Sequence, residues 1–405
     1  MSEMKCVPEL RFSNFEGGWS CIALGQLLEF KNGINASKEQ YGSGKKFINV
    51  LDIIKNEFIT HDRIIGSVNI TESEFEKNIV SYGDVLFQRS SETREEVGQS
   101  NIYLDQLKNA TFGGFVIRGK KIGDYYPKFL NLSLKTPFVR KEMTSRSGGS
   151  TRYNIGQESL SKVQVYLPSV EEQQKIAHFL SSVDQKIQQL TEKHRLLTDY
   201  KKGVMQQIFT QQIRFKDDQG NDYPEWKKLP LKEIASFFSG GTPKSSNKSF
   251  YIGDIPFIKS GEINSEKTEQ FISQKALESS SAKMVEVGDL LYALYGATSG
   301  EVAVCKINGA INQAVLCIRT DENINYLFNW LRFSKDRILS TYLQGGQGNL
   351  SAQIIKELQA PIPSIDEQTK IADFLTAIDQ KIQQTQTTLN QTQAFKNGLF
   401  QKMFV

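Results

Sequence analysis

The chain has 405 residues, which is too long for one ordinary domain and predicts two or three. With 39% hydrophobic and 23% charged residues, it has the composition of a globular protein and not of a disordered one. Lysine and arginine number 49 against 45 aspartates and glutamates, so the net charge of +4 does not by itself indicate a polyanionic partner.

The first residues, MSEMKCVPEL, contain no apolar signal region, and no run approaches the 18 apolar residues that would predict a membrane span. The four cysteines are far apart and form no CxxC or Cys/His cluster: Cys6, Cys21, Cys305 and Cys317. This spacing argues against a disulfide framework and against a zinc site. We therefore expect a cytoplasmic protein in a reducing compartment that has no membrane partner.

In chain order, the sequence predicts a first globular domain over residues 1–167, a long helix over 168–209, a second globular domain over 210–362 and a second long helix over 363–405. Both globular segments contain short apolar runs separated by Gly, Asn and Ser turns, which is typical of strands. A few helices are expected among them, for example over 127–144 and 325–344. The fold class is therefore α+β, with two mixed, β-rich domains.

The two long helical segments are copies of one sequence. PSVEEQQKIAHFLSSVDQKIQQ from Pro168 and PSIDEQTKIADFLTAIDQKIQQ from Pro363 are identical at 15 of 22 positions and lie 195 residues apart. Weaker repeats link the globular segments, such as GDVLF from Gly83 with GDLLY from Gly288. One ancestral unit has been used twice, with a shared scaffold and two diverged surfaces.

Each long helix begins with a predicted capping box, Ser169–Glu172 in the first and Ser364–Glu367 in the second. Apolar residues then recur at alternating spacings of four and three, which is typical of a coiled-coil seam. The seam consists of Ile176, Leu180, Val183, Ile187, Leu190, Leu197, Val204, Ile208, Ile371, Leu375, Ile378, Ile382, Leu389, Leu399 and Met403. If a pseudo-two-fold axis relates the halves, the helices form an antiparallel pair. A parallel pair, or two helices each packed on its own domain, are the alternatives.

Several catalytic motifs are missing. GSGKK at Gly42 and GGTPKSS at Gly240 lack the spacing of a phosphate-binding loop. The three histidines, His61, His178 and His194, do not form a metal cluster or a catalytic triad in the sequence. The sequence therefore favours a binding protein over an enzyme.

The repeated phrase, here LPSVEEQQKIAHFLSSVDQKI and IPSIDEQTKIADFLTAIDQKI, resembles the specificity (S) subunit of type I restriction-modification systems. The resemblance covers the whole chain. It implies a non-catalytic subunit whose two target-recognition domains each read half of a bipartite, gapped site in double-stranded DNA. It also implies docking of two methylation (M) subunits and up to two restriction (R) subunits. No cofactor is expected in this chain; S-adenosylmethionine, ATP and Mg²⁺ would belong to the partners.

DNA contacts are expected from Arg and Lys toward phosphates and guanine, and from Asn and Gln toward adenine. In the first domain the candidates follow the Gly83 strand and surround the Gly-rich loop: Gln88, Arg89, Ser90, Arg94, Arg146, Ser147, Arg152 and Tyr153. In the second domain they are Lys244, Ser245, Lys248, Lys259, Tyr292, Tyr295, Thr298, Gln344, Gln347 and Asn349. Each of these side chains could instead be an ordinary turn residue or a solvated charge.

Residues beside the helix seam that are identical in both copies are candidates for contacts with methylation subunits: Gln173, Lys175, Gln185, Lys186, Gln368, Lys370, Gln380 and Lys381. A plain solvated helix face is the alternative. From another functional class, the whole chain is also compatible with a coiled-coil structural adaptor whose two β-rich domains bind proteins.

Overall fold

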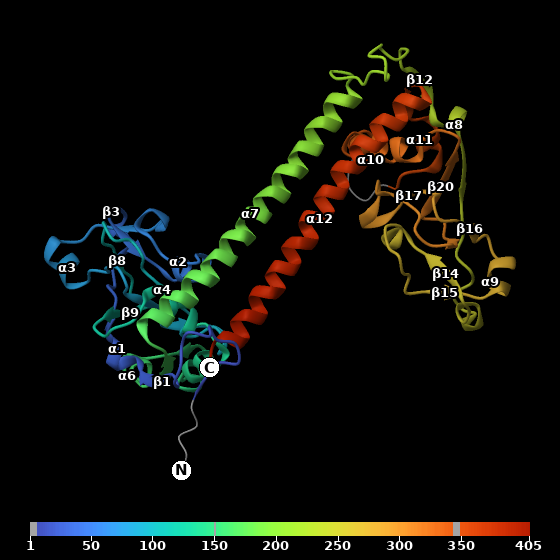
Figure 1. Ribbon diagram of the computed structural model, residues 1–405. Coiled ribbons are helices and arrows are strands. Elements are labelled where there is room, and N and C mark those ends of the chain that lie inside the picture. Colours follow the sequence, from blue (N-terminus) through green and yellow to red (C-terminus); the bar gives the residue numbers. More distant parts are fainter. Residues whose placement is uncertain (1–5, 150, 343–348) are drawn as a thin grey trace. The chain divides into compact units, whose positions relative to one another are not determined.

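The computed structural model describes residues 6–149, 151–342 and 349–405 (Figure 1). The chain forms two compact units, which we describe separately. Unit 1 comprises residues 1–189 and 388–405, and unit 2 comprises residues 190–387. Each unit therefore contains part of both long helices, α7 (Val170–Phe209) and α12 (Ile365–Met403). Within the described residues, no helix is long and apolar enough to cross a membrane.

Unit 1 is built from short strands and short helices. Its strands are β1 (Ser20–Ala23), β2 (Leu28–Asn32), β3 (Tyr41–Ile48), β4 (Ser67–Val68), β5 (Val85–Gln88), β6 (Ser90–Ser91), β7 (Ser100–Ile102), β8 (Thr111–Phe112), β9 (Val116–Lys121), β10 (Tyr153–Asn154) and β11 (Gln164–Leu167). Its helices besides α7 and α12 are α1 (Leu24–Leu27), α2 (Val50–Lys55), α3 (Glu72–Lys77), α4 (Pro127–Ser133), α5 (Pro137–Ser145) and α6 (Gln157–Ser161).

Unit 2 repeats this plan with small changes. Its strands are β12 (Lys227–Pro230), β13 (Ala235–Ser239), β14 (Ile255–Ile258), β15 (Phe271–Ile272), β16 (Lys283–Val285), β17 (Leu290–Ala293), β18 (Val302–Val304), β19 (Gly309–Ile311), β20 (Val315–Thr320) and β21 (Gln359–Ile362). Its helices are α8 (Leu231–Ile234), α9 (Gln274–Glu278), α10 (Ile324–Tyr342) and α11 (Ala352–Glu357), with 3₁₀ turns η3 (Lys248–Tyr251), η4 (Ser260–Glu262) and η5 (Gly296–Thr298).

The main sheets of the two units correspond strand by strand, while the second sheet has three strands in unit 1 and four in unit 2. The antiparallel sheet β2-β9-β5-β7 of unit 1 matches β13-β20-β17-β18 of unit 2. A second sheet contains a parallel pair in both units, β3 with β8 and β14 with β19. A two-stranded pair, β1-β11 or β12-β21, precedes each long helix. The structure therefore confirms the expected α+β class and shows that the repeat includes the globular parts.

One predicted helix is interrupted. The stretch expected as a single helix over 127–144 forms two helices, α4 and α5, because Pro137 lacks the N–H that a continuous helix needs. Thr136 caps the second helix by accepting a hydrogen bond from the Val139 N–H. In unit 2 the corresponding α10 continues from Ile324 to Tyr342 without a break, and residues 343 and 344 of that prediction lie outside the described residues.

Within each unit, α7 and α12 run in opposite directions, as expected for an antiparallel pair (Figure 1). In unit 1 the start of α7 packs in one core with the end of α12, and in unit 2 the end of α7 packs with the start of α12. The buried seam residues are Ile176, Leu180, Leu190, Val204, Ile208, Ile371, Leu375, Ile378, Leu389, Leu399 and Met403. The half-buried ones are Val183, Ile187, Leu197 and Ile382.

Two ion pairs interrupt the apolar seam at equivalent positions of the repeat. In unit 2, the Nζ of Lys201 lies 2.6 Å from the carboxylate of Asp379. In unit 1, Lys396 pairs in the same way with Asp184. Both partners are displaced by 195 residues between the pairs, so each helix contributes one lysine and one aspartate. Lys201 is only 8% exposed, and burial lowers its pKa despite the hydrogen bond to Asp379.

The predicted capping boxes form only in part. The Glu172 N–H donates to the Ser169 hydroxyl at 3.4 Å, but the Glu172 carboxylate is held by Arg11 in two hydrogen bonds of 2.7 and 2.8 Å. Arg214 holds Glu367 in the same way in unit 2, at 2.8 and 3.2 Å. A bidentate arginine competes effectively for a buried carboxylate. Each long helix is thus clamped at its start by the segment that leads into its own unit.

The paired strand segments GDVLF and GDLLY place Asp84 and Asp289 in different electrostatic environments. Burial raises the pKa of Asp84, because the hydrogen bonds from the Ser81 and Lys121 N–H groups and the nearby charge of Arg118 do not offset it. Burial also acts to raise the pKa of Asp289, but two hydrogen bonds from Arg319, at 2.7 and 2.8 Å, and one from the Glu286 N–H outweigh it. The pKa of Asp289 is therefore lowered.

We predict that Asp379→Ala lowers the free energy of unfolding by about 2 kcal/mol, because it leaves the buried ammonium of Lys201 without its partner. The double variant Lys201→Met/Asp379→Ala should recover most of this loss, since it removes the charge as well. Denaturant unfolding of the full chain measures both effects. Asp373→Ala, an exposed position on the same helix, is the control; an equal loss there would contradict the assignment.

We also predict a pH-dependent effect of Asp289→Asn. A lowered pKa means that the Asp289 carboxylate stabilises the fold above its unfolded value of about 3.9. This stabilisation, about 1 kcal/mol for a pair that is partly exposed, is lost as the pH falls through the lower folded value. The stability difference between wild type and variant should be full at pH 7 and should shrink below about pH 4. The exposed Asp321→Asn should show no such trend.

Candidate DNA-recognition interface

In unit 1, two loops that are far apart in sequence form one surface. The loop after β5 contributes β6, the loop after α5 contributes β10, and these short strands pair through Ser90 with Asn154 and Ser91 with Tyr153. The Ile155 N–H donates to the Arg89 carbonyl at 3.0 Å, and the Ser90 hydroxyl bonds to the Asn154 side chain. The structure therefore joins the two predicted loops of this unit.

Glycine makes the tight turn of the second loop. Gly149 has a φ of +124°, and a Cβ there would lie 2.0 Å from the Arg152 carbonyl oxygen. A side chain does not fit at that position, so the turn that brings β10 back toward β6 requires glycine. The bridge between Gly148 and Asn154 closes the same turn.

The four arginines of this surface have different surroundings. Arg89 and Arg152 are exposed, and the Arg89 guanidinium lies 3.4 Å from the Gly114 carbonyl oxygen. Arg94 donates to the Thr144 carbonyl at 3.1 Å, and Arg146 pairs with Glu142 at 2.7 Å. Arg89 and Arg152 are thus the arginines available to a ligand, while Arg94 and Arg146 are partly engaged in holding the loops together.

The other predicted residues of this surface are less accessible. Ser147 donates to the Thr144 carbonyl at 2.7 Å, and Tyr153 is half-buried in β10. Gln88 is buried at the end of β5, where its amide donates to the Ser90 carbonyl at 2.9 Å. Among the described residues its Oε1 has no hydrogen-bond partner. These side chains support the surface more than they extend from it.

Sequence reasoning missed one residue that supports the first loop. Arg140 on α5 donates to the carbonyls of Glu95 and Val97 at 2.8 and 2.7 Å. It therefore fixes the segment that follows Arg94. In the sequence Arg140 stands in an ordinary helical stretch, and no local pattern marks it.

Unit 2 holds its loops with the same backbone hydrogen bond. The Leu350 N–H donates to the Leu294 carbonyl at 3.0 Å, which is the counterpart of the bond between Ile155 and Arg89. A further backbone hydrogen bond joins the first loop of each unit to the turn before β9 or β20. The Arg89 N–H donates to the Phe115 carbonyl at 3.0 Å, and the Leu294 N–H donates to the Ala314 carbonyl at 2.8 Å. The two-loop arrangement is therefore common to both units.

The side chains on this arrangement differ in unit 2. Tyr295 and Thr298 are half-buried around η5, and Asn349 is exposed. Lys259 is exposed and precedes η4, which packs against η5. Thr242 bonds to Gln313 at 2.7 Å and so ties the segment of the exposed residues Lys244, Ser245 and Lys248 to the neighbouring turn. Gln344 and Gln347 lie outside the described residues.

Tyr292 does not belong to this surface. It lies in β17, the strand between β20 and β18, and its side chain is fully buried. Burial also raises its pKa strongly. All four residues of β17 are buried, so its sequence shows no alternation that would have indicated which side chains face outward. We therefore leave Tyr292 out of the candidate DNA contacts.

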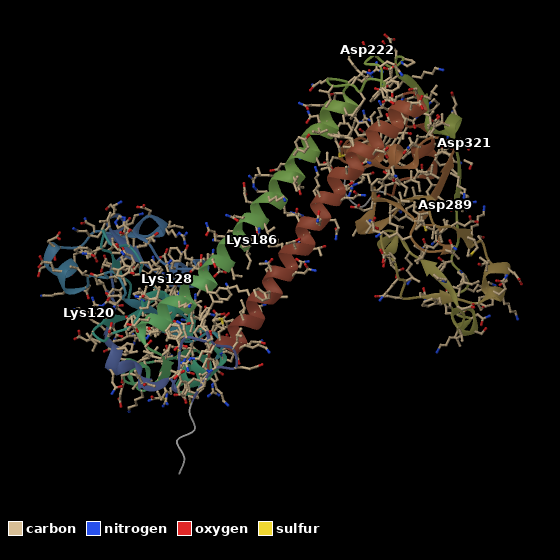
Figure 2. All side chains as sticks on the ribbon, viewed as in Figure 1. Lys120, Lys128, Lys186, Asp222, Asp289 and Asp321 are labelled. Carbon is tan, nitrogen blue, oxygen red and sulfur yellow. The ribbon has the colours of Figure 1, made fainter. Side chains whose placement is uncertain are left out.

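Two of the predicted partner-facing residues of the long helices are also buried. Gln173 is 1% exposed and accepts from the Tyr126 N–H at 2.9 Å, while Gln368 is fully buried and accepts from the Asn323 N–H at 3.0 Å. Lys175 and Lys370 hold the segments that lead into each unit, through Asn14 and Asp218. Lys175 is exposed despite this contact, and so are Gln185, Lys186, Gln380 and Lys381. Lys186 is labelled in Figure 2.

Comparison with known proteins agrees with this arrangement. The family model described as type I restriction modification DNA specificity domain matches residues 16–198 and again residues 223–393. The MjaVIII type I restriction enzyme specificity subunit of Methanocaldococcus jannaschii is 23% identical over 389 residues, covering 90% of this chain and 87% of that protein.

Two solved structures share the fold. The S subunit of a type I restriction-modification system from M. genitalium superposes with a TM-score of 0.59 at 16% identity, covering 98% of this chain and 99% of that one. The HsdS subunit of Thermoanaerobacter tengcongensis gives a TM-score of 0.53 at 18% identity, with 95% of each chain covered. Because the two matches to the family model span most of the sequence, the chain belongs to the type I restriction-modification DNA specificity family, as the repeat predicted.

Proposed function

We propose that this chain is the specificity subunit that directs a type I restriction-modification complex to a bipartite, gapped DNA site. The globular segments 1–167 and 210–362 would each act as a target-recognition domain for one half-site. One observation carries the proposal: both units hold two loops together by equivalent backbone hydrogen bonds, while the side chains on those loops differ. Two domains with the same scaffold and different loop side chains suit the recognition of two different base sequences.

The available side chains fit base reading in the major groove. In unit 1, the exposed Arg89 and Arg152 have the guanidinium that pairs in bidentate fashion with guanine. In unit 2, the exposed Asn349 has the amide that suits adenine, and Tyr295 and Thr298 offer hydroxyl groups. Lys259 and the segment with Lys244 and Lys248 supply charges for phosphates.

The long helices suit a spacer with docking positions for partners. A helix rises about 1.5 Å per residue, so the length of the α7–α12 pair would fix the gap between the half-sites. Gln185 and Lys186 are exposed on α7, and the identical residues Gln380 and Lys381 are exposed on α12. One residue set used twice suits two copies of one methylation subunit, with up to two restriction subunits joining them.

This chain would not itself catalyse a reaction. The chemistry of the complex would lie in the partners, which would use S-adenosylmethionine for methylation and ATP with Mg²⁺ for DNA translocation and cleavage. Methylome sequencing with and without this gene, in cells that express the partner subunits, tests the proposal. Deletion should abolish methylation at one gapped adenine motif, and unchanged methylation there would refute the assignment.

We predict that Arg152→Ala costs roughly 1–3 kcal/mol of DNA-binding free energy and relaxes only one half-site. Methylome sequencing of the variant should show degenerate bases in that half and an unchanged second half. Lys141→Ala, an exposed change on α5 outside both loops, is the control. Relaxation of both halves together would contradict a model with two separate readers.

We further predict that the gap follows the length of the helix pair. Inserting one heptad after His194 and another after Thr385, which lie opposite one another in the register of the two ion pairs, adds about 10 Å to the pair. At roughly 3.4 Å per base pair, the gap should lengthen by about three base pairs. The sequences of both half-sites should stay the same. A methylome in which the half-sites change and the gap does not would contradict the spacer role.

A further inference from the structure

Each unit contains a cleft beside its long helices. In unit 1, a cleft of about 500 Å³ lies among α4, α7 and α12, with Phe58, Lys128, Lys135, Asp184 and Lys396 in its walls. Lys128 is labelled in Figure 2. In unit 2, a cleft of about 390 Å³ lies between α7 and α10, with Lys201, Lys202, Met205, Arg332 and Asp336 in its walls. Neither cleft contains residues of the two-loop surfaces described above.

The two clefts occupy equivalent places in the repeat. The segment FLNLSLK, which runs from α4 into the turn at Lys135, aligns with YLFNWLR of α10, which ends at Arg332. The first two residues and the sixth are buried in both. Lys396 and Lys201 are likewise 195 residues apart. Each cleft thus has one cation from the segment after β9 or β20, Lys135 in the turn after α4 or Arg332 in α10, and one cation from a long helix. The surrounding residues have diverged, but this pair of charges is present twice.

Positive charge exceeds negative charge in both clefts. In unit 1, Arg63, Lys128, Lys135 and Lys396 face two carboxylates, Glu57 and Asp184. In unit 2, Lys201, Lys202 and Arg332 face Asp336 and the Asp379 carboxylate that pairs with Lys201.

The equivalent cations repel one another in the free protein. Burial lowers the pKa of Lys135, and the charge of Lys396 acts in the same direction, while the carboxylates of Glu57 and Asp184 oppose it. Burial likewise lowers the pKa of Lys201, with Arg332 contributing in the same direction. The Nζ of Lys135 is 3.5 Å from one acceptor, the Glu57 carbonyl, at the limit of a hydrogen bond. An anion bound between the cations of each cleft would offset their mutual repulsion.

We propose that each cleft binds a backbone phosphate of duplex DNA in the unread spacer between the two half-sites. The inference depends on the proposed function, because it assumes that the chain binds such a site. DNA is favoured as the ligand because phosphate contacts supply most of the affinity of protein–DNA complexes. The chain has a net charge of only +4, and the candidate loop residues Tyr295, Thr298 and Asn349 of unit 2 are uncharged, so cations elsewhere in the chain would have to contact the phosphates. Local cationic clefts would supply that affinity without reading sequence.

The test uses the full chain assembled with its methylation subunits and a fluorescent duplex that contains the recognition site. Lys135→Ala, Arg332→Ala and the double variant are compared with Lys141→Ala on α5 and Arg337→Ala on α10, two exposed positions outside the clefts. Each cleft variant should reduce the slope of log K against log salt by about 0.9, and the double variant by about twice that. Affinity should fall by the same factor for the cognate site and for a duplex with scrambled half-sites.

A second arm changes the DNA. Neutral methylphosphonates in the spacer should weaken binding by the wild-type complex and should have little further effect on the double variant. Methylphosphonates outside the site should affect both complexes equally. Thermal melting of each variant checks that the fold is retained.

Three results would overturn the inference. The first is an unchanged salt slope in the double variant. The second is equal sensitivity of the wild-type and double-variant complexes to methylphosphonates in the spacer. The third is loss of methylation-subunit binding at an unchanged salt slope, which would make the clefts protein-docking sites. If the wild-type complex binds DNA with no sequence preference, the proposed function fails instead. If the complex still prefers the cognate site and the salt slope of the double variant is unchanged, only the proposed phosphate binding in the clefts is rejected.

Discussion

The antiparallel pairing of α7 with α12 is the constraint on which the rest of the structure depends. Neither unit completes its core from one continuous stretch of chain. Unit 1 needs the end of α12, where Phe404 stacks on Phe129 at 5.3 Å and meets Trp19 edge-on at 6.2 Å. Unit 2 needs the end of α7, where Phe209 packs on Tyr326 and Phe333. Phe209 and Phe404 are equivalent residues of the repeat, so the same exchange of helix ends closes both cores.

The polar groups in this pairing specify its register. An apolar seam alone tolerates a shift by one heptad, because Leu and Ile are similar in shape at every level. The pairs Lys201–Asp379 and Lys396–Asp184 permit one register, since any shift would leave a partly buried ammonium without its carboxylate. The ion pairs of Arg11 with Glu172 and of Arg214 with Glu367 constrain the helices further, because they fix where each helix starts relative to its own unit. Stability comes mainly from the apolar cores, and the buried charges determine which arrangement is stabilised.

Some of these features could be predicted from the sequence, and others could not. The repeat, the seam and the helix starts are local patterns, so they could be read directly from the residues. The ion pairs could not, because nothing local shows that Lys201 lies opposite Asp379. Tyr292 illustrates the same limit for the candidate site, since a central strand that is buried on both faces has no polar alternation. The positions of Gln173 and Gln368 off the seam predict exposed side chains, whereas each accepts a hydrogen bond from the residue just before another helix of its unit, α4 or α10.

The way the loops are held explains how recognition can diverge on a fixed fold. In both units the bonds that join the first loop to its neighbours run between backbone groups, from Ile155 to Arg89 and from Leu350 to Leu294. Backbone bonds do not depend on which side chain stands at the position, so a substitution at the exposed Arg89 changes the surface and leaves the joint in place. Leu294 holds the same place in unit 2, but its side chain is buried in the core. Gly149 in the second loop of unit 1 is the exception, because the turn there has no room for a side chain. Under the proposed function, specificity would change by substitution at exposed loop positions, while the helix pair, its ion pairs and the loop joint stay constrained.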